Sequence, residues 1–219
     1  MGVETVVVVA GGHASPDGVP DLRPDGAYVI AADAGVDRGL ALGLHIDRAI
    51  GDFDSISASG LAAAEAAGAT VERHPAAKDA TDLELALDAA IALRPARILV
   101  IGSAGGRLDH LLGSILLLGD ARYGAATVDA YLDGNRIAVI RGSRTLTGMP
   151  GDLVTLLPVH GPAAGVSTSG LEYPLHDETL PPGTTRGVSN VFAAAEARIT
   201  VGDGCLIAVQ PGPEREESL

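Results

Sequence analysis

Short runs of β-branched and aliphatic residues, separated by segments with helical periodicity, fill the first half of the chain and most constrain its fold. Several runs are apolar at every position, which is typical of strands that are covered on both faces of a parallel sheet. Parallel strands need crossover connections, and helices usually supply them. The runs that predict strands span residues 5–10, 27–32, 48–52, 70–74 and 97–102.

Helical periodicity is clearest in the segment that precedes Pro95, where Leu83, Leu87 and Ile91 recur on one face. A proline just beyond such a pattern is a common stop signal. Strands that alternate with helices predict an α/β domain, built as a Rossmann-like parallel sheet with flanking helices. The predicted helices span residues 59–68, 81–93 and 106–118.

Beyond about residue 125, strand-like runs follow one another with almost no helical periodicity between them. Turn sequences at 133–135 and 202–204 fit hairpins, so we expect an all-β sandwich or barrel-like second domain. The segment 159–187 is rich in Gly, Pro, Ser and Thr, and is predicted to be a long loop of the kind that often has a function. The strand-like runs are 127–132, 136–140, 153–158, 197–201 and 205–209. We therefore place domains at 1–125 and 126–212, followed by a flexible acidic tail at 213–219.

The net charge of -13 comes from 28 acidic and 15 basic residues, and it disfavours broad electrostatic binding of nucleic acid or of an anionic membrane. No run approaches the ~20 apolar residues of a membrane span. The first residues lack the basic region of a signal peptide, so we expect a cytoplasmic protein. Cys205, the single cysteine, excludes an internal disulfide and is expected to be buried.

Acidic residues follow the predicted strands at the points where those strands end. Asp33 follows one strand, and Asp52 and Asp54 close the next, where a two-residue spacing in extended chain directs both carboxylates to the same side. Ligands of parallel sheets bind at this edge. Convergent carboxylates repel each other unless a cation neutralises them, and Mg²⁺ binds carboxylates together with phosphate oxygens. The alternative is a solvated turn in which Ser55 caps the next helix.

A second polar cluster, residues 78–82, precedes the helix at 81–93 and includes Thr81. Lys78 is expected to meet a phosphate or to pair with a neighbouring carboxylate. Asp79 is either the N-cap of the helix or a catalytic group. Asp82 lies in the first helical turn and is assigned to the metal together with Asp52 and Asp54.

A glycine-rich linker at 102–110 joins a predicted strand to a predicted helix, where backbone N–H groups can bind phosphates. No lysine follows its last glycine, so it is not the common phosphate-binding loop, and Arg107 could provide the cation instead. His110 is either a general base or a partner in a structural hydrogen bond. Gly11 and Gly12, after the first strand, form a second candidate for close approach to a nucleotide, or simply a tight turn.

Six sequence blocks in a fixed order resemble the thiamine pyrophosphokinase (thiamine diphosphokinase) family. The blocks are 32–35 (Ala-Asp-Ala-Gly), 51–55 (Gly-Asp-Phe-Asp-Ser), 78–87, 105–110, 170–175 and 187–190. The resemblance implies an N-terminal catalytic domain that binds ATP and Mg²⁺, and a C-terminal β-sandwich that binds thiamine. It also implies a homodimer with active sites in clefts between the N-terminal domain of one chain and the β domain of the other. The implied reaction moves the pyrophosphoryl group of ATP to the hydroxyl of thiamine, which yields thiamine diphosphate and AMP.

The resemblance also assigns roles to individual residues. Those that are expected to hold Mg²⁺ and the phosphates or to orient the acceptor are Asp33, Asp52, Asp54 and Asp82. Those at the nucleotide site are Arg107 and Asp109, and those on the thiamine side are Tyr173, Ser189 and Asn190, with the Tyr173 ring stacking on the pyrimidine. Whether Asp79 or Asp82 hydrogen-bonds the attacking hydroxyl stays open.

The chain departs from the family pattern at Ala77, where an acidic residue is common, and at Ala34, where glycine is common. Two other functions remain open on the sequence. One is a pyrophosphokinase with another heterocyclic alcohol as acceptor, such as a pterin. The other is a non-catalytic sensor of thiamine or nucleotide.

Overall fold

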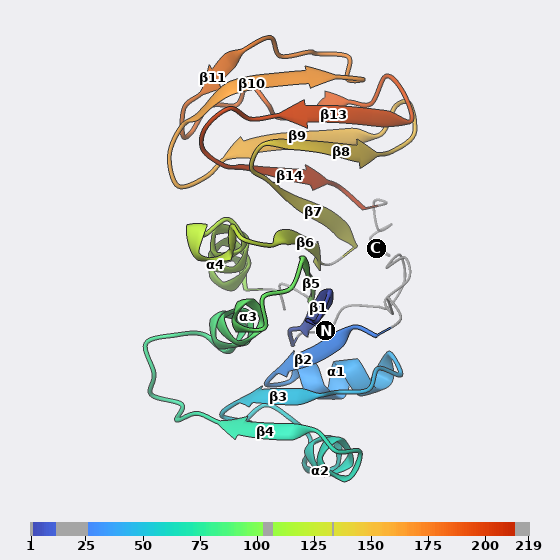
Figure 1. Ribbon diagram of the computed structural model, residues 1–219, viewed down its shortest axis with the longest axis vertical. Helices are drawn as coiled ribbons and strands as arrows, with labels where there is room; N and C mark the ends of the chain where they lie inside the picture. Colours follow the sequence, from blue (N-terminus) through green and yellow to red (C-terminus); the bar gives the residue numbers. More distant parts are fainter. Residues whose placement is uncertain (1, 12–25, 103–106, 133, 213–219) are drawn as a thin grey trace, which may run out of the picture. The chain divides into compact units, whose positions relative to one another are not determined.

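The computed structural model describes residues 2–11, 26–102, 107–132 and 134–212 (Figure 1). The chain divides into two compact units. The first contains Met1–Leu117 and Ala125–Gly134, and the second contains Leu118–Gly124 and Asn135–Leu219. Within the described ranges, no helix is long and apolar enough to cross a membrane.

The first unit contains a parallel sheet with the strand order β6-β5-β1-β2-β3-β4. All five residues of β1 are buried, as its uninterrupted apolar sequence predicts for a strand with both faces covered. The strands are β1 (Thr5–Val9), β2 (Tyr28–Ala32), β3 (Arg48–Gly51), β4 (Thr70–Arg73), β5 (Arg97–Gly102) and β6 (Thr127–Leu132). The predicted α/β class is confirmed.

Helices cover both faces of this sheet, with α3 on one side and α1 and α2 on the other (Figure 1). The helices are α1 (Gly35–Ala41), α2 (Ala58–Ala66), α3 (Asp82–Ala92) and α4 (Leu108–Leu118). The helix α1 was not predicted. It is only two turns long, and two of its seven residues, Gly35 and Gly39, are glycines, which favour helices poorly. Ser57 caps α2 and Thr81 caps α3, so the alternatives that gave these roles to Ser55 and Asp79 are wrong. In each case the side-chain oxygen of the capping residue accepts a hydrogen bond from the backbone N–H three residues later.

The strand β6 belongs to the first unit, whereas residues 127–132 were predicted to belong to the β-rich second half. It pairs in parallel with β5 over its whole length, from Arg97 opposite Thr127 to Gly102 opposite Leu132. An apolar run predicts a strand, but it does not say which sheet the strand joins. That choice depends on long-range pairing.

The second unit consists of two antiparallel sheets with a common core. One sheet has the order β12-β9-β14-β7, and the other has the order β11-β10-β13-β8. Their strands are β7 (Asn135–Ile140), β8 (Ser143–Thr147), β9 (Leu153–Pro158), β10 (Ala163–Ser169), β11 (Glu178–Leu180), β12 (Asn190–Val191), β13 (Glu196–Thr200) and β14 (Leu206–Gln210). Buried side chains of both sheets, among them Leu156 and Ile199, form one cluster with Phe192 at 0% exposure. This is the sandwich arrangement that was expected.

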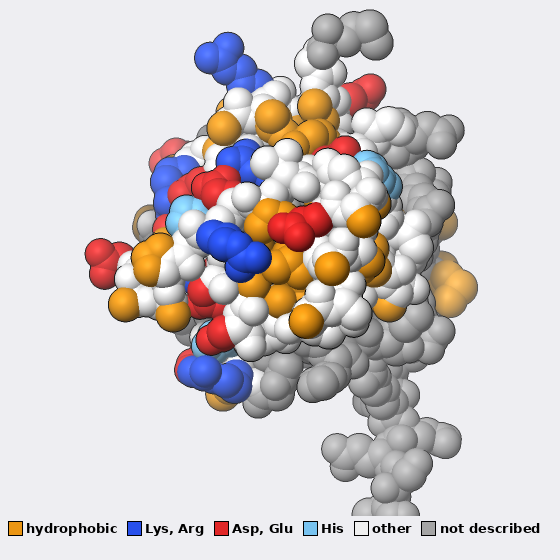
Figure 2. All heavy atoms as spheres, turned by 90° about the horizontal axis from the view of Figure 1, so that it is seen from below, with side chains coloured by type: hydrophobic (Ala, Val, Ile, Leu, Met, Phe, Trp, Pro, Cys, Tyr) orange, Lys and Arg blue, Asp and Glu red, His pale blue; other side chains and the backbone are white. Residues whose placement is uncertain are grey.

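The segment 159–187 is not one long loop, because it contains β10 and β11. The sequence of β10, Ala-Ala-Gly-Val-Ser-Thr-Ser, has few apolar residues, and only Ala163, Val166 and Thr168 of this strand are buried. Pairing with β13 and β11 stabilises it as a strand. Cys205 is buried, as predicted. On the face drawn in Figure 2, acidic and basic side chains lie beside one another around apolar surface.

Candidate active site

Three acidic side chains of the first unit converge where the parallel strands end. Asp33 follows β2, Asp52 follows β3, and Asp82 is the first residue of α3. One oxygen atom from each lies within 4.8 Å of the others. All three line a cavity of about 820 Å³, whose other walls come from the start of α3, the start of α4 and the end of β1.

Close backbone packing places Asp33 at this point. The backbone of Asp33 has a φ of 45°, and the Asp33 N–H donates a hydrogen bond to Ile50 O over 2.9 Å. A Cβ atom on Gly35 would overlap the carbonyl oxygen of Val9, so this position requires glycine. The methyl group of Ala34, by contrast, faces Gly11 and fits beside it. The glycine that this turn needs is therefore Gly35, and the departure from the family pattern at Ala34 is accommodated.

The environment of Asp33 is that of a cation ligand. Its Oδ1 atom is buried and has no hydrogen-bond partner among the described residues. Burial raises the pKa of Asp33, and the Asp82, Asp52 and Asp54 carboxylates raise it further, although the Ala34 N–H opposes them. A buried, unpaired carboxylate oxygen facing other carboxylates is costly unless a positive charge neutralises it. Oxygen-only ligands of this kind suit Mg²⁺.

Lys78 supplies part of this positive charge. Its Nζ atom lies 2.9 Å from Asp82 Oδ1, as an ion pair without hydrogen-bond geometry, and 3.4 Å from Asp52 Oδ2. Burial opposes the charge on Lys78, yet the two carboxylates raise its pKa. The N–H of Asp54 lowers the pKa of Asp52, and Lys78 adds to this effect. Of the two roles left open for Lys78, pairing with carboxylates is the one that the structure contains.

Asp54 lies apart from this triad, although it also lines the cavity. The predicted metal set was Asp52, Asp54 and Asp82, whereas the residues that the structure brings together are Asp33, Asp52 and Asp82. The reason is local. The strand ends at Gly51 and Phe53 has a φ of 63°, so the two-residue alternation of an extended chain does not apply here. Ser55 Oγ donates to Asp54 Oδ1 over 2.7 Å.

Two contacts that the sequence did not reveal fix the loop 52–57. The Arg73 guanidinium lies 5.1 Å from the centre of the Phe53 ring, a cation–π contact. At the other end of the loop, the Asp37 carboxylate accepts hydrogen bonds from Ser57 N over 2.8 Å and from Ser57 Oγ over 2.7 Å. Both partners are 20 residues from the loop positions that they contact, so no local pattern marks them.

The opposite wall of the cavity includes Arg107, Asp109 and His110 at the start of α4. Arg107 makes a bidentate contact with Asp109, over 2.6 Å and 3.2 Å, which lowers the pKa of Asp109 to about 2. Thr81, the N-cap of α3, and Glu84, in the first turn of α3, also line the cavity. Glu84 was not among the predicted site residues. Several predicted positions lie outside the described residues: Gly12, the linker residues 103–106 and the tail 213–219. Asp79 is exposed, outside the lining that the described residues form.

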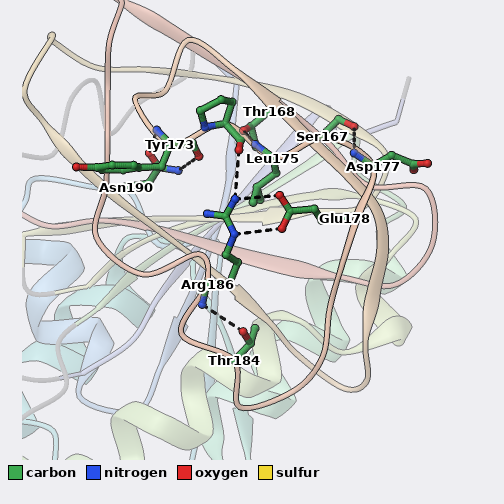
Figure 3. Close-up of polar contacts among 10 residues, drawn as sticks. Ser167, Thr168, Tyr173, Leu175, Asp177, Glu178, Thr184, Arg186 and Asn190 are labelled. Atoms are coloured by element: carbon green, nitrogen blue, oxygen red, sulfur yellow. Dashed lines mark hydrogen bonds and ion pairs between the residues drawn. The ribbon is translucent and has the colours of Figure 1, made fainter.

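The residues expected on the thiamine side lie in the second unit, and Figure 3 shows two of them, Tyr173 and Asn190. Tyr173 is 57% exposed, and Ser189 is exposed with a φ of 54°. Asn190 differs from both, because it is only 2% exposed. Its side chain forms hydrogen bonds with the backbone of Tyr173.

Comparison with known proteins finds two family profiles that match successive parts of the chain. Residues 20–128 match the family profile described as "Thiamin pyrophosphokinase, catalytic domain". Residues 139–206 match the profile described as "Thiamin pyrophosphokinase, vitamin B1 binding domain". The chain belongs to the thiamin pyrophosphokinase family. The acidic triad lies in the first match, and Tyr173 and Asn190 lie in the second.

Relatives within the thiamin pyrophosphokinase family cover nearly the whole chain. The thiamine pyrophosphokinase of Bacillus subtilis is 28% identical over 221 residues, which is 95% of this chain and 99% of that protein. Its crystal structure matches with a TM-score of 0.82 over 96% of this chain and 100% of that one. The crystal structure of a thiamin pyrophosphokinase family protein from Enterococcus faecalis is 26% identical and matches with a TM-score of 0.79, over 97% of this chain and 100% of that one.

Proposed function

We propose that this chain is a Mg²⁺-dependent transferase that moves the diphosphate group of ATP to the hydroxyl of thiamine, producing thiamine diphosphate and AMP. The observation that supports this most directly is the convergence of Asp33, Asp52 and Asp82 at a cavity within the part that matches the catalytic-domain profile. The match to a vitamin B1 binding domain in the same chain supports thiamine as the acceptor. A cytoplasmic location is also part of the proposal.

Asp33, Asp52 and Asp82 are the residues that we assign to Mg²⁺, with Asp54 at the edge of the same cavity. The buried Asp33 Oδ1, which has no hydrogen-bond partner among the described residues, supports this assignment. When bound, the ion would neutralise charge on the phosphate oxygens and act as a Lewis acid. We expect Lys78 to leave its present position between Asp52 and Asp82 and to contact a phosphate oxygen.

The remaining polar groups of the cavity suit the triphosphate. The N-cap Thr81 and the first residues of α3, Asp82 to Glu84, line the cavity, and the positive end of a helix favours anions. Arg107 can donate two parallel hydrogen bonds to a phosphate once it releases Asp109. Diphosphate transfer needs little covalent work from the protein, so positioning and charge neutralisation are its main contributions.

In the proposed reaction, the hydroxyl oxygen of thiamine attacks the β-phosphorus of ATP. The bond from that phosphorus to the oxygen bridging to the α-phosphorus breaks, AMP departs with the bonding electrons, and the proton of the hydroxyl is released to solvent water. We assign the hydrogen bond to the attacking hydroxyl to Asp82 and not to Asp79, because Asp82 lines the cavity and Asp79 is exposed outside it. Tyr173 is proposed to stack on the pyrimidine of thiamine, and Ser189 to lie beside it.

We also propose that the enzyme acts as a homodimer, on the basis of the family resemblance of both halves of the chain. Sedimentation equilibrium at several protein concentrations tests this. A single species with the 22.0 kDa mass of one chain at all concentrations would refute it.

Incubation of the protein with ATP, Mg²⁺ and thiamine, followed by detection of AMP and thiamine diphosphate, tests the reaction itself. We expect both products in equal amounts, and neither in EDTA. AMP formation that does not depend on thiamine would indicate another acceptor. Thiamine or nucleotide binding without any product would indicate a sensor.

A further inference from the structure

Tyr173 presents an exposed ring from a backbone segment that is fixed on all sides. Tyr173 is 57% exposed, whereas Leu175, two residues on, is completely buried in the core of the sandwich. Exposed aromatic residues on loops usually move freely. Here, every backbone N–H and carbonyl group from Tyr173 to Leu175 has a hydrogen-bond partner (Figure 3).

Asn190 binds the Tyr173 backbone on both sides. Its Oδ1 atom accepts from Tyr173 N over 3.1 Å and from Val191 N over 2.9 Å, and its Nδ2 atom donates to Tyr173 O over 2.8 Å. A side-chain amide oxygen has two lone pairs, so Oδ1 is fully used. Because Asn190 is also 2% exposed, little of its amide is available to a ligand.

Thr168 and Arg186 fix the two residues that follow. The Leu175 N–H donates to Thr168 Oγ1 over 2.9 Å, and Leu175 O accepts from Thr168 N over 2.9 Å. Pro174 has no N–H group, and its carbonyl oxygen accepts from Arg186 Nη2 over 3.4 Å. Arg186 is itself oriented by Glu178, through bidentate contacts of 2.9 Å and 3.1 Å.

We propose that Asn190 is a positioning residue, which together with the Arg186–Glu178 pair fixes the Tyr173 backbone so that its exposed ring forms a preformed platform for the aromatic ring of the acceptor. This inference rests on the proposed function, in which the acceptor ring stacks on Tyr173. It changes the role expected for Asn190, from a group that touches thiamine to one that acts through Tyr173.

A rigid platform improves binding because it removes an entropic cost. A flexible loop must be ordered when the ligand binds, whereas a loop that is already fixed loses no further freedom. Tyrosine suits this purpose, since it offers a large flat surface with only two rotatable side-chain bonds. Loss of the Asn190 contacts is therefore expected to weaken acceptor binding without changing the chemistry at the acidic triad.

Thiamine affinity of the full chain, measured by titration calorimetry, provides the first test. We expect Asn190→Ala to weaken thiamine binding by ~10-fold. Arg186→Met, a milder substitution at an exposed residue, should weaken it by ~3-fold. ATP affinity and kcat should be nearly unchanged in both variants. Ser167→Ala is the matched control. It removes a hydrogen bond of the same kind, to Asp177 N over 3.0 Å in the same loop, without touching Tyr173 or Pro174, and should change thiamine affinity less than ~2-fold.

A double-mutant cycle separates positioning from direct contact. If Asn190 acts through Tyr173, Asn190→Ala has almost no further effect in a Tyr173→Ala background. Multiplicative losses would mean that Asn190 contacts the acceptor itself, and would overturn the inference. Thiamine-dependent AMP formation by the wild type, together with normal thiamine affinity of Tyr173→Ala, would overturn the platform while leaving the proposed reaction intact.

Hydrogen exchange gives a readout that does not depend on any activity. The Tyr173 amide should exchange at least ~10-fold faster in Asn190→Ala and also faster in Arg186→Met, but not in Ser167→Ala. Arg186→Met keeps this test decisive if Asn190→Ala fails to fold. Unchanged exchange at Tyr173 in a folded variant would overturn the proposal, whether or not the protein transfers diphosphate.

Discussion

Asp33→Asn offers a sharp test of the acidic triad, because it removes one charge and almost no volume. Asparagine tolerates the left-handed backbone of this residue, so the turn should survive. Among the neighbouring carboxylates, Asp82 raises the pKa of Asp33 most, and its oxygen lies within 4.8 Å of an Asp33 oxygen. At that distance two unit charges repel by about 1 kcal/mol in water and by about 3.5 kcal/mol at an effective dielectric constant of 20.

We therefore expect the variant to be more stable than the wild type when no metal is present. Lys78 offsets part of the repulsion, so we expect a gain of about 1–2 kcal/mol in the free energy of unfolding. For a chain of this length, such a gain raises Tm by roughly 2–8 °C. The assay is thermal unfolding in EDTA at neutral pH. The exposed Asp203→Asn serves as a charge-matched control and should leave Tm nearly unchanged.

Mg²⁺ should reverse this order. A ligand that binds only the folded state stabilises it by about 2.7 kcal/mol at 100 times its Kd, and the wild type should gain this while Asp33→Asn gains much less. Lower stability of Asp33→Asn in EDTA, or an equal gain of both proteins in Mg²⁺, would refute the assignment of Asp33 as a strained metal ligand.

The pH dependence has a definite sign. The pKa of Asp33 is raised above its ordinary value of 3.8, so in the pH window between those two values the folded state binds more protons than the unfolded state. In metal-free wild type, the contribution of Asp33 to stability therefore falls as the pH rises through that window. The advantage of Asp33→Asn should grow over the same window and vanish below the ordinary value. Mg²⁺ affinity should follow the opposite course, because the ligand must be ionised.

Three further substitutions test other parts of the site. Asp54→Ala should abolish most AMP formation while the circular dichroism spectrum stays native, and near-normal turnover by the folded variant at saturating Mg²⁺ would show that Asp54 is not needed. Gly35→Ala should cost about 1–3 kcal/mol or more in urea unfolding, since its methyl group would overlap Val9 O; wild-type stability would mean that the turn can open without strain. Asp37→Ala removes both acceptors of Ser57 and should cost about 1–3 kcal/mol and weaken Mg²⁺ binding, whereas unchanged Mg²⁺ affinity would show that the loop 52–57 keeps its shape without them.

Much of the fold was predictable because its signals are local. Runs of mainly apolar residues predicted β1, β2, β3 and β5 to within a residue or two, since a strand that is covered on both faces is apolar along most of its length. The strand β10 was missed for the same reason, because its Ser, Thr and Gly residues look like a loop until β13 and β11 pair with them.

The site was predictable to a similar degree. The rule that ligands bind at the carboxyl ends of parallel strands predicts from the sequence alone that Asp33, Asp52, Asp54 and Asp82 belong to the site. It did not separate Asp54 from the triad, because that depends on the left-handed backbone at Phe53, which no local pattern marked. Nor did it find Glu84, since an acidic residue in a first helical turn is common for reasons of the helix dipole alone.

By itself, then, the sequence determined the α/β and all-β halves, the acidic edge and the family resemblance, because each depends on residue types at short and fixed spacings. Only the tertiary structure decided that β6 joins the parallel sheet, that Asp33 stands with Asp52 and Asp82, and that the Asn190 amide is occupied by the Tyr173 backbone. These facts depend on contacts between residues 17 to 49 positions apart in the chain, and such contacts are set by packing and pairing in three dimensions.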